Sequence, residues 1–525
     1  MINAGLKQFL VFLALAGLSA AVYVGLATTG GSSGFPLDDA WIHQTYARNL
    51  AGSGQLAYVP GQPSAGSTSP LWTLLIAIGY KLNIDTRLWT YALGAISLAL
   101  TAWFLTRLSL RLWPDRPRLA LAAGLLCLFE WHLAWAAASG METVLFTALA
   151  LALMERAVQA RASWRDGLIF GALGGLLTVT RPEGLLLVGL AGLAVLARSR
   201  AGGRSQESLI SAAGNFPRFV VASFLGFGVF VLPAAWLNWQ ASGTPFPNTF
   251  YAKQQEYAGY FSSFAAWLPR ALAVVSAPFI GPQVLLAPGF LRATFSTLRR
   301  LPDRTTWPRA LPIVWVVAHL GVYAARLPVT YQHGRYLIPV IPVILLFGLH
   351  SSVGWLRRWE GWRREGRHRE GWHREGRHRE MPPTGFLRRV GIGSLFAAAA
   401  AFWLVGAGAY RVDVNVIETE LVASAQWIAM NTAPDALVAA HDIGAIGYFA
   451  RRPLLDLAGL ISPEVIPIIR DEAALSDLLR ARRADYLAAP PDFYTTLLAA
   501  PELEPVFAGA APFMQQHWQV FRLSW

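Results

Sequence analysis

Long apolar runs constrain this chain more than any other feature of its sequence. Residues 8–27 are apolar for about 20 residues, which is the length that an α-helix needs to cross a bilayer. Further runs of spanning or nearly spanning length bring the expected total to about eleven, and they lie at 87–106, 118–137, 142–160, 166–180, 183–197, 216–238, 269–291, 309–326, 335–352 and 389–410. With 54% hydrophobic and only 14% charged residues, the chain is expected to be a polytopic α-helical membrane protein, and a soluble enzyme is excluded.

Basic residues concentrate on one set of connections between these runs. If the N-terminus is cytoplasmic, the inner connections are rich in arginine, at residues 107–118, 156–165, 198–218, 292–304 and 357–389. The outer connections carry only scattered cations, namely Arg48, Lys81, Arg181, Lys253, Arg326 and Arg335. This asymmetry follows the positive-inside rule, so the net charge of +13 orients the chain and does not indicate a nucleic-acid partner. The shorter run at residues 70–82 cannot cross and is expected to lie at the membrane surface.

Hydropathy falls after Tyr410, which divides the chain into two expected domains. Residues 1–410 form the transmembrane domain, with an outer loop at 28–86 that carries interfacial helices and a basic cytoplasmic loop at 353–388. An odd number of spans places residues 411–525 outside, as an extracytoplasmic α/β domain. Its strands are expected near residues 437–440, 454–457 and 486–489, and its helix at 471–483. The expected location is the bacterial cell (inner) membrane, with a cytoplasmic N-terminus.

The basic loop contains a tandem repeat, GWRREGRHRE at residues 361–370 followed by GWHREGRHRE at 371–380. Its histidines could suggest metal binding. A run of charges of this kind is better explained as a solvated linker between two spans.

Five polar clusters fall at the outer ends of the apolar runs. They lie at residues 38–39, 139–143, 180–184, 247–253 and 332–336. Ionisable groups in a bilayer cost about 2.5–3.5 kcal/mol at its centre and less near its surface, so those that are present tend to be functional. Their convergence on one leaflet predicts a single site at the outer face of the membrane.

The aspartate pair in the first outer loop is the most informative of these clusters. Asp38 and Asp39 precede a segment in which Ile42, Tyr46 and Leu50 recur at helical spacing. This pattern predicts an amphipathic interfacial helix with both aspartates at its N-terminus, where a cap and the helix dipole favour a carboxylate. A structural role for both aspartates as caps is one interpretation. Because one cap needs one aspartate, a second carboxylate is left to act as a base.

The other clusters supply cations. Arg181 and Arg335 lie at proline or glycine breaks, where a guanidinium group can bind two phosphate oxygens. Snorkelling toward lipid headgroups would explain both arginines equally well, and the same alternative holds for Lys253. His333 can donate to a phosphate or satisfy a local hydrogen bond.

Carboxylates and aromatic residues accompany the cations. Glu142 and Glu183 can pair with the arginines, which is the preferred interpretation, or bind a divalent cation together with Asp38. Three tryptophans near the same ends are expected to belong to the interfacial aromatic belt: Trp41, Trp72 and Trp135.

These blocks of sequence resemble a known family. LDDAWI at residues 37–42, YARNL at 46–50 and GSTSPLW at 66–72 resemble the first outer loop of polytopic GT-C glycosyltransferases. They look closest to the terminal β-(1→2)-arabinofuranosyltransferase group. Four further blocks also fit that group: SGMET at 139–143, TRPEG at 180–184, PNTFYAK at 247–253 and HGRY at 333–336. The resemblance covers roughly residues 1–410, with a weaker echo in HDIGAIG at 441–447.

The resemblance implies a GT-C-like fold and an inverting transferase at the outer face. Such an enzyme moves a sugar from a polyprenyl-phosphate donor to a hydroxyl group of an envelope glycan or another acceptor. The family's first-loop base maps onto Asp38 or Asp39, and Asp38 is favoured as the first acid of the pair. Four residues are expected to bind the donor phosphate: Arg335, Arg181, Lys253 and His333. Five are expected to support them: Glu142, Glu183, Tyr336, Asn248 and Tyr251.

No cofactor is implied with certainty, and a divalent cation at Asp38 or Asp39 is an open alternative.

Several other functions are alternatives to a transferase. A lipid-linked sugar transporter or flippase would need polar residues through the bilayer, whereas residues 185–196 and 338–347 are nearly without charge. A noncatalytic envelope assembly protein would leave five clusters on one side unexplained. A protein O-mannosyltransferase-like enzyme is a further alternative. An ATP-driven pump is disfavoured because the sequence has no phosphate-binding glycine-rich loop.

Overall fold

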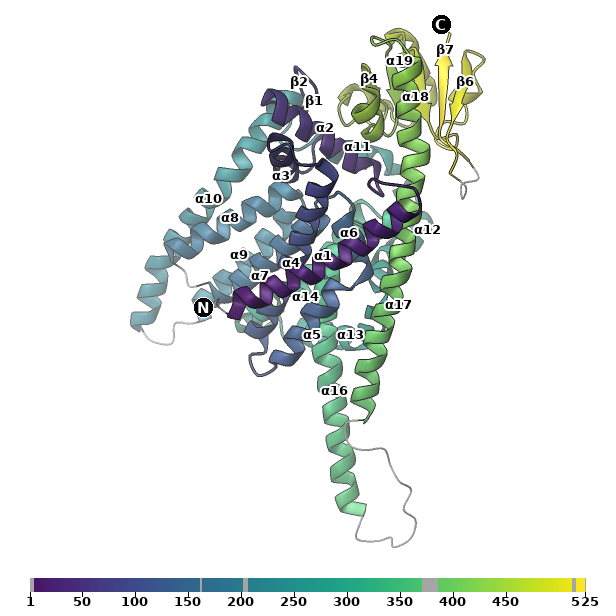
Figure 1. Ribbon diagram of the computed structural model, residues 1–525. Coiled ribbons are helices and arrows are strands. Elements are labelled where there is room, and N and C mark those ends of the chain that lie inside the picture. Colours follow the sequence, from purple (N-terminus) through teal and green to yellow (C-terminus); the bar gives the residue numbers. More distant parts are fainter. Residues whose placement is uncertain (1–3, 161–162, 202–205, 371–385, 512–515, 525) are drawn as a thin grey trace.

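A helical bundle carries a small domain at one of its ends in the computed structural model (Figure 1). The structure describes residues 4–160, 163–201, 206–370, 386–511 and 516–524. The main helices of the bundle are α1 (Ala4–Thr29), α4 (Thr86–Leu112), α5 (Pro117–Leu128), α6 (Trp131–Ala138), α7 (Thr143–Gln159), α8 (Trp164–Thr180), α9 (Gly184–Ala201), α10 (Gln206–Ser242), α12 (Phe264–Ser276), α13 (Ala287–Leu298), α14 (Trp307–Arg326), α16 (Ile341–Glu370) and α17 (Phe386–Val416).

Six of the described helices are long and apolar enough to cross a membrane, or eight if each of two bent pairs counts as one span. The chain therefore has the architecture of a multi-pass membrane protein. The expected number of about eleven spans is not confirmed by this measure. Helices α7 and α8 lie where spans were expected, but each has only 17 residues.

Two expected spans are broken near their middle. The run at 118–137 forms α5 and α6, which meet at 52°, and the run at 269–291 forms two arms that meet at 92°. The second break falls between the 3-10 turns η2 (Ala277–Phe279) and η3 (Pro282–Leu286). At the first break the side chain of Glu130 accepts the Leu133 N–H and so begins a new helix. Gln283 Nε2 lies 3.3 Å from Glu130 Oε1, so the two breaks meet inside the bundle.

The outer loop between α1 and α4 folds into two helices and a hairpin. These are α2 (Asp38–Ser53), β1 (Ala57–Val59), β2 (Gln62–Pro63) and α3 (Pro70–Lys81). Helix α2 is not the half-exposed interfacial helix that its spacing predicts, because both of its faces are buried. The bundle covers one face and the C-terminal domain covers the other, as the cross-domain contacts of Arg48 and Trp41 with Tyr448 show.

The three tryptophans that were expected in an interfacial belt are instead core residues. Trp41, Trp72 and Trp135 are at most 2% exposed. Trp72 Nε1 donates to the Gly140 carbonyl and Trp135 Nε1 to Asp413, so each indole hydrogen bond holds two segments of the chain together.

The last span continues into the C-terminal domain without a break. Helix α17 runs past residue 410 into a π-helical turn, η6 (Ile417–Val422), and then into α18 (Ala423–Asn431), so the expected boundary at 410/411 falls within a continuous helix. At the other end of α17, the connection from α16 includes the first copy of the basic repeat, which continues α16 to Glu370. The second copy at 371–380 lies outside the described residues.

A five-stranded sheet forms the body of the C-terminal domain. Its strands are β3 (Val438–Ala440), β4 (Leu454–Asp456), β5 (Tyr486–Ala489), β6 (Leu503–Ala508) and β7 (Gln519–Leu523), in the order β4-β3-β5-β7-β6. Strand β3 is parallel to β4 and β5, whereas β7 is antiparallel to β5 and β6. The expected strands and the helix α19 (Glu472–Arg482) are confirmed, and β6 and β7 were not expected.

Candidate functional site

Three cations gather around the ring of Tyr336. The guanidinium carbons of Arg335 and Arg181 lie 4.9 and 5.5 Å from its centroid, and the ammonium of Lys253 lies at 5.6 Å. Arg181 caps the end of α8, Lys253 lies on α11 (Asn248–Glu256), and Tyr336 with Arg335 precedes α16. Segments far apart in the sequence thus bring three positive charges to the ring of Tyr336. Three of the four residues that were expected to bind a phosphate therefore lie close together.

Arg335 links this cluster to the first outer loop. Its Nη2 forms an ion pair with Asp39 Oδ2 and lies 3.0 Å from the Tyr336 hydroxyl. The side chain of Arg335 is 3% exposed, and within the described part of the chain its Nε and Nη1 have no hydrogen-bond partner. Buried donors of this kind are costly unless an acceptor is supplied. A phosphate oxygen is a suitable acceptor, because guanidinium N–H groups match its geometry.

The backbone before Arg335 adopts an unusual conformation. Gln332, His333 and Gly334 all have positive φ, at 54°, 56° and 65°. Each non-glycine residue in this region costs roughly 1–2 kcal/mol, so the surrounding structure must hold the segment in place. This turn brings the chain from α15 (Tyr331–Gly334) into α16 and places Arg335 and Tyr336 at the head of the span.

A buried ion network fixes Arg181. Its Nε lies 2.7 Å from Glu142 Oε1, and its Nη2 donates to the Thr143 hydroxyl at 2.7 Å. His43 Nε2 lies 3.2 Å from the other oxygen of Glu142, and Glu183 Oε1 lies 3.8 Å from Arg181 Nη1. The expected pairing of Glu142 and Glu183 with an arginine is present. The ion pair with Glu142 therefore keeps the Arg181 guanidinium in position beside Tyr336.

Asp38 and Asp39 have different partners, although they are adjacent. Neither aspartate caps α2, because the cap residue is Leu37 and no side-chain cap bond forms. Asp39 meets Arg335, whereas Asp38 Oδ2 and Oδ1 accept the backbone N–H groups of Gly444 and Ala445 at 2.6 and 2.7 Å. The C-terminal domain therefore holds the Asp38 carboxylate, whereas Arg335 holds that of Asp39.

The two carboxylates also differ in their electrostatics. Burial and the nearby Asp442 carboxylate raise the pKa of Asp38 well above its usual value, and the Gly444 and Ala445 amides only partly oppose this. Burial alone would raise the pKa of Asp39 as well, but Arg335 and Lys253 outweigh burial and lower it. Asp39 is thus held as a paired anion, whereas the Asp38 carboxylate binds a proton more readily than an ordinary aspartate does.

The segment that binds Asp38 is one in which the family resemblance is weak. It is HDIGAIG at residues 441–447, which follows the end of strand β3. Asp442 lies here, with its side chain 42% exposed and hydrogen-bonded to His441 at 3.2 Å. Ligand sites collect beyond the carboxyl ends of parallel strands, so the position of this segment after a predicted strand was an available signal.

The remaining expected residues lie around the cluster or away from it. Asn248 holds the loops together, because its side chain donates to the Leu460 carbonyl at 3.0 Å and its backbone N–H to Ala65. His333 is bound to Asp413 at 2.8 Å, and no described contact joins it to the cations. Tyr251 packs against Phe250, and the described contacts do not join it to the cluster either.

A divalent cation has few ligands here. Among the described residues, no group of three or more His, Cys, Asp or Glu side chains is arranged to hold a metal ion. The Asp38 oxygens are occupied by backbone donors and Asp39 by Arg335, so these residues do not offer a site suited to a cation as they stand.

Comparison with known proteins gives a family for the end of the chain and a fold for the whole of it. Residues 410–523 match a family described as a domain of unknown function (DUF8728). No curated protein matches the chain. ArnT from Cupriavidus metallidurans, solved bound to undecaprenyl phosphate, is 15% identical with a TM-score of 0.57, over 98% of this chain and 97% of that one.

A second similar structure is the oligosaccharyltransferase AglB from Archaeoglobus fulgidus, solved with an inhibitory peptide and a dolichol-phosphate. It is 12% identical with a TM-score of 0.58, over 92% of this chain and 69% of that one. The chain has a GT-C-like fold. The arabinofuranosyltransferase AftD from Mycobacteria is 14% identical with a TM-score of 0.46, over 98% of this chain and 41% of that one. The expected arabinofuranosyltransferase group is not confirmed.

Proposed function

We propose that this protein is a glycosyltransferase that moves a sugar from a polyprenyl-phosphate donor to a hydroxyl group at the extracytoplasmic face of the membrane. The observation that carries the proposal is the group of cations around Tyr336, two of them buried and Lys253 half-buried, set beside two aspartates at the end of a membrane bundle. Cations with unpartnered buried N–H groups suit a phosphate, and the bundle suits its lipid tail. The fold shared with proteins solved with undecaprenyl and dolichol phosphates supports this donor class.

The reaction is a single displacement. The acceptor oxygen attacks the anomeric carbon, the bond from that carbon to the phosphate oxygen breaks, and polyprenyl phosphate leaves with the bonding electrons. Asp38 takes the proton of the acceptor hydroxyl, and its raised pKa suits this work. Arg335, Arg181 and Lys253 stabilise the charge that develops on the leaving phosphate. One displacement inverts the anomeric configuration.

The aspartate pair divides two tasks between its members. Asp39 fixes Arg335 through an ion pair, and its lowered pKa keeps it charged while the phosphate enters and leaves. Asp38 is oriented by the amides of Gly444 and Ala445, and each of its oxygens keeps a further lone pair for the acceptor proton. The C-terminal domain thereby positions the base, and its loop beside Asp442 is where we place the acceptor.

Binding of undecaprenyl phosphate to the purified full chain tests the donor site directly. Arg335→Gln is expected to weaken binding at least tenfold, because it removes a charge-assisted hydrogen-bond donor from a buried site. The matched control is Arg326→Gln, which changes an exposed arginine at the end of α14 and should leave binding unchanged. Equal affinities for the two variants would refute the site.

Transfer is tested with Asp38→Asn. This variant should insert and bind undecaprenyl phosphate like the wild type, with sugar transfer from membrane-extracted lipid donors abolished. Mass spectrometry of envelope glycans from a deletion strain identifies the sugar and acceptor to use. If sealed vesicles instead show the lipid-linked sugar crossing the membrane without a glycan product, the protein is a transporter and the proposal fails.

A further inference from the structure

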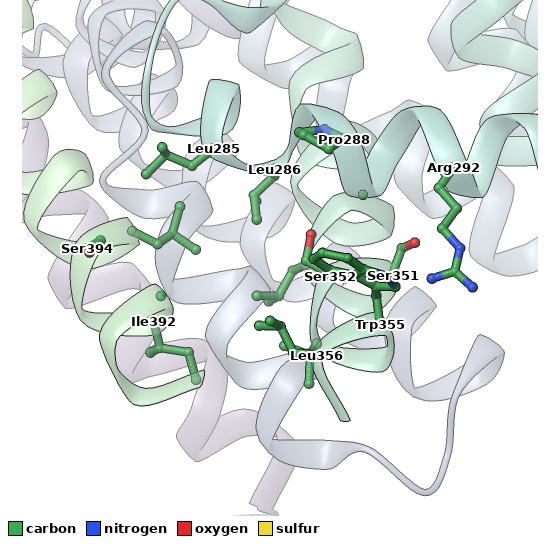
Figure 2. A pocket seen from close by; sticks show the side chains of 15 residues that line it. Leu285, Leu286, Pro288, Arg292, Ser351, Ser352, Trp355, Leu356, Ile392 and Ser394 are labelled. Atoms are coloured by element: carbon green, nitrogen blue, oxygen red, sulfur yellow. The ribbon is translucent and has the colours of Figure 1, made fainter. Parts of the chain in front are cut away.

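A cavity of about 430 Å³ lies well below the cation cluster, between three segments of the bundle (Figure 2). It is lined by η3 and the start of α13, by residues 349–356 of α16 and by residues 391–395 of α17. Its volume is within the range of about 300–1,000 Å³ that is typical of ligand pockets. The first α16 residue that lines the cavity, Leu349, follows Arg335 by 14 residues, which corresponds to roughly 20 Å along a helix.

The cavity forms because α13 packs closely against α16, whereas the neighbouring part of α17 leaves space. At Gly289 the α13 backbone lies so close to α16 that an added Cβ would overlap Ser352, and at Gly348 it would lie 2.8 Å from Leu286. Helix α17 instead presents Gly391, whose Cβ position has no heavy atom within 4 Å. The cavity therefore has free space beside Gly391.

The cavity has an apolar floor and an open rim. Leu286, Leu349, Val353 and Leu395 form the floor and are at most 4% exposed. Trp355 at the rim is 56% exposed. Since these segments belong to apolar helices with the length and hydropathy of membrane spans, the open side of the cavity faces hydrocarbon.

One charged side chain lies at the cavity, and it is basic. Arg292 lines one edge, with Ser351 on the same side, while Ile392 and Ser394 lie across from it (Figure 2). No acidic side chain is among the lining residues. The same end of α13 leads into Arg299 and Arg300, so the local potential is positive. This is the arginine-rich end that the positive-inside rule places at the cytoplasmic face.

We propose that this cavity binds an anionic diacyl phospholipid of the inner leaflet, with one acyl chain on the apolar floor and the phosphate at Arg292. Basic pockets between spans on the cytoplasmic side are suited to such headgroups. The sugar donor is a poorer fit, because its phosphate belongs at Arg335, near the opposite end of the span. The proposal does not depend on the transferase function. It requires only the membrane placement of α13, α16 and α17.

The experiment compares lipid retention by the full chain purified in native-lipid particles. Native mass spectrometry counts bound lipids, and phosphatidylglycerol and phosphatidylethanolamine are then titrated as probes. Gly391→Leu fills the open space in the cavity and should lower phosphatidylglycerol binding about tenfold or more. Gly393→Leu is the matched control, because its Cβ position is equally open but residue 393 does not line the cavity.

A second pair of variants tests the headgroup. Arg292→Gln should remove the preference for phosphatidylglycerol over phosphatidylethanolamine. Arg326→Gln, which changes an exposed arginine at the end of α14 and away from the cavity, should retain it. Equal retention in the two leucine variants overturns the proposal. So does an unchanged headgroup preference in Arg292→Gln, or recovery of polyprenyl phosphate in place of phospholipid. The Arg335→Gln variant should lose undecaprenyl phosphate binding but retain phosphatidylglycerol in the cavity. This result would show that the two sites are separate.

Discussion

Gly444→Ala is the sharpest test of how the C-terminal domain meets the aspartate pair. A Cβ at residue 444 would overlap the Asp38 carbonyl oxygen and lie 2.7 Å from Asp38 Oδ2. Neither atom can yield easily, because the first belongs to the backbone of α2 and the second already accepts the Gly444 N–H. The added methyl group must therefore push the segment at 441–447 away from α2.

The size of the effect follows from the bonds that are lost. The Gly444 and Ala445 amides each donate to the Asp38 carboxylate, and hydrogen bonds to a charged group contribute about 1.5–3 kcal/mol each. Losing both weakens local docking by about 3–6 kcal/mol. Every 1.4 kcal/mol is a factor of about ten, so amide hydrogen exchange at these two positions should accelerate at least about 100-fold. Mass spectrometry of peptides covering residues 441–447 measures it.

A matched substitution separates this contact from a general effect of losing a glycine. Gly408→Ala changes a glycine of α17 whose Cβ position has no heavy atom within 4 Å, so it should leave exchange at residues 441–447 unchanged. Wild-type exchange rates at positions 444 and 445 in the Gly444→Ala variant would refute the inferred contact with Asp38. Sugar transfer should fall together with the protection, because the base loses its orientation.

Three further predictions concern charges in and around the site. Glu142→Gln removes the carboxylate whose Oε1 lies 2.7 Å from Arg181 Nε and leaves a buried, unpaired guanidinium. The free energy of unfolding, measured by thermal unfolding, should therefore fall by about 3–5 kcal/mol. Asp442→Asn removes a negative charge that raises the pKa of Asp38. Because transfer requires ionised Asp38, the acidic limb of the kcat/KM profile should move to lower pH. Lys253→Met removes a half-buried cation of the phosphate site and should raise the KM for the donor roughly tenfold.

Each of these changes has a control elsewhere in the chain. Glu504→Gln breaks an exposed ion pair and should cost under about 1 kcal/mol, so a similar small loss for Glu142→Gln would contradict the buried network. Asp435→Asn removes an exposed carboxylate and should leave the pH profile in place. An acidic limb that stays fixed or moves to higher pH in Asp442→Asn would contradict the electrostatics. Lys81→Met should not change the KM.

The bundle was readable from sequence because long apolar runs have few alternatives to a spanning helix. The breaks within runs were harder to predict, since hydropathy averages over them. Residues 118–137 read as one span, yet Glu130 ends one helix and begins another by accepting the Leu133 N–H. A buried acid inside an apolar run was the signal for this break. The 92° bend was marked only by the sequence around Pro282.

The members of the site were predictable, but their partners were not. Polar clusters at the outer ends of spans pointed to Arg181, Lys253 and Arg335, because charged side chains near a bilayer are costly and tend to be functional. Nothing in the local pattern separates Asp38 from its neighbour Asp39. The separation comes from Gly444, which is 406 residues away in the sequence, and pairing over such distances depends on how the C-terminal domain docks.

The dependence of Asp38 on the last domain has a consequence for biosynthesis. Asp38 is made well before the amides that hold its carboxylate, which follow it by 406 and 407 residues. At translation rates of about 5–20 residues per second, this interval lasts roughly 20–80 s. During it, the nascent chain can insert its early spans while its reactive centre stays incomplete. A premature stop before residue 437 would therefore yield a bundle without the amides that hold Asp38, and under the proposed function this bundle should not transfer sugar.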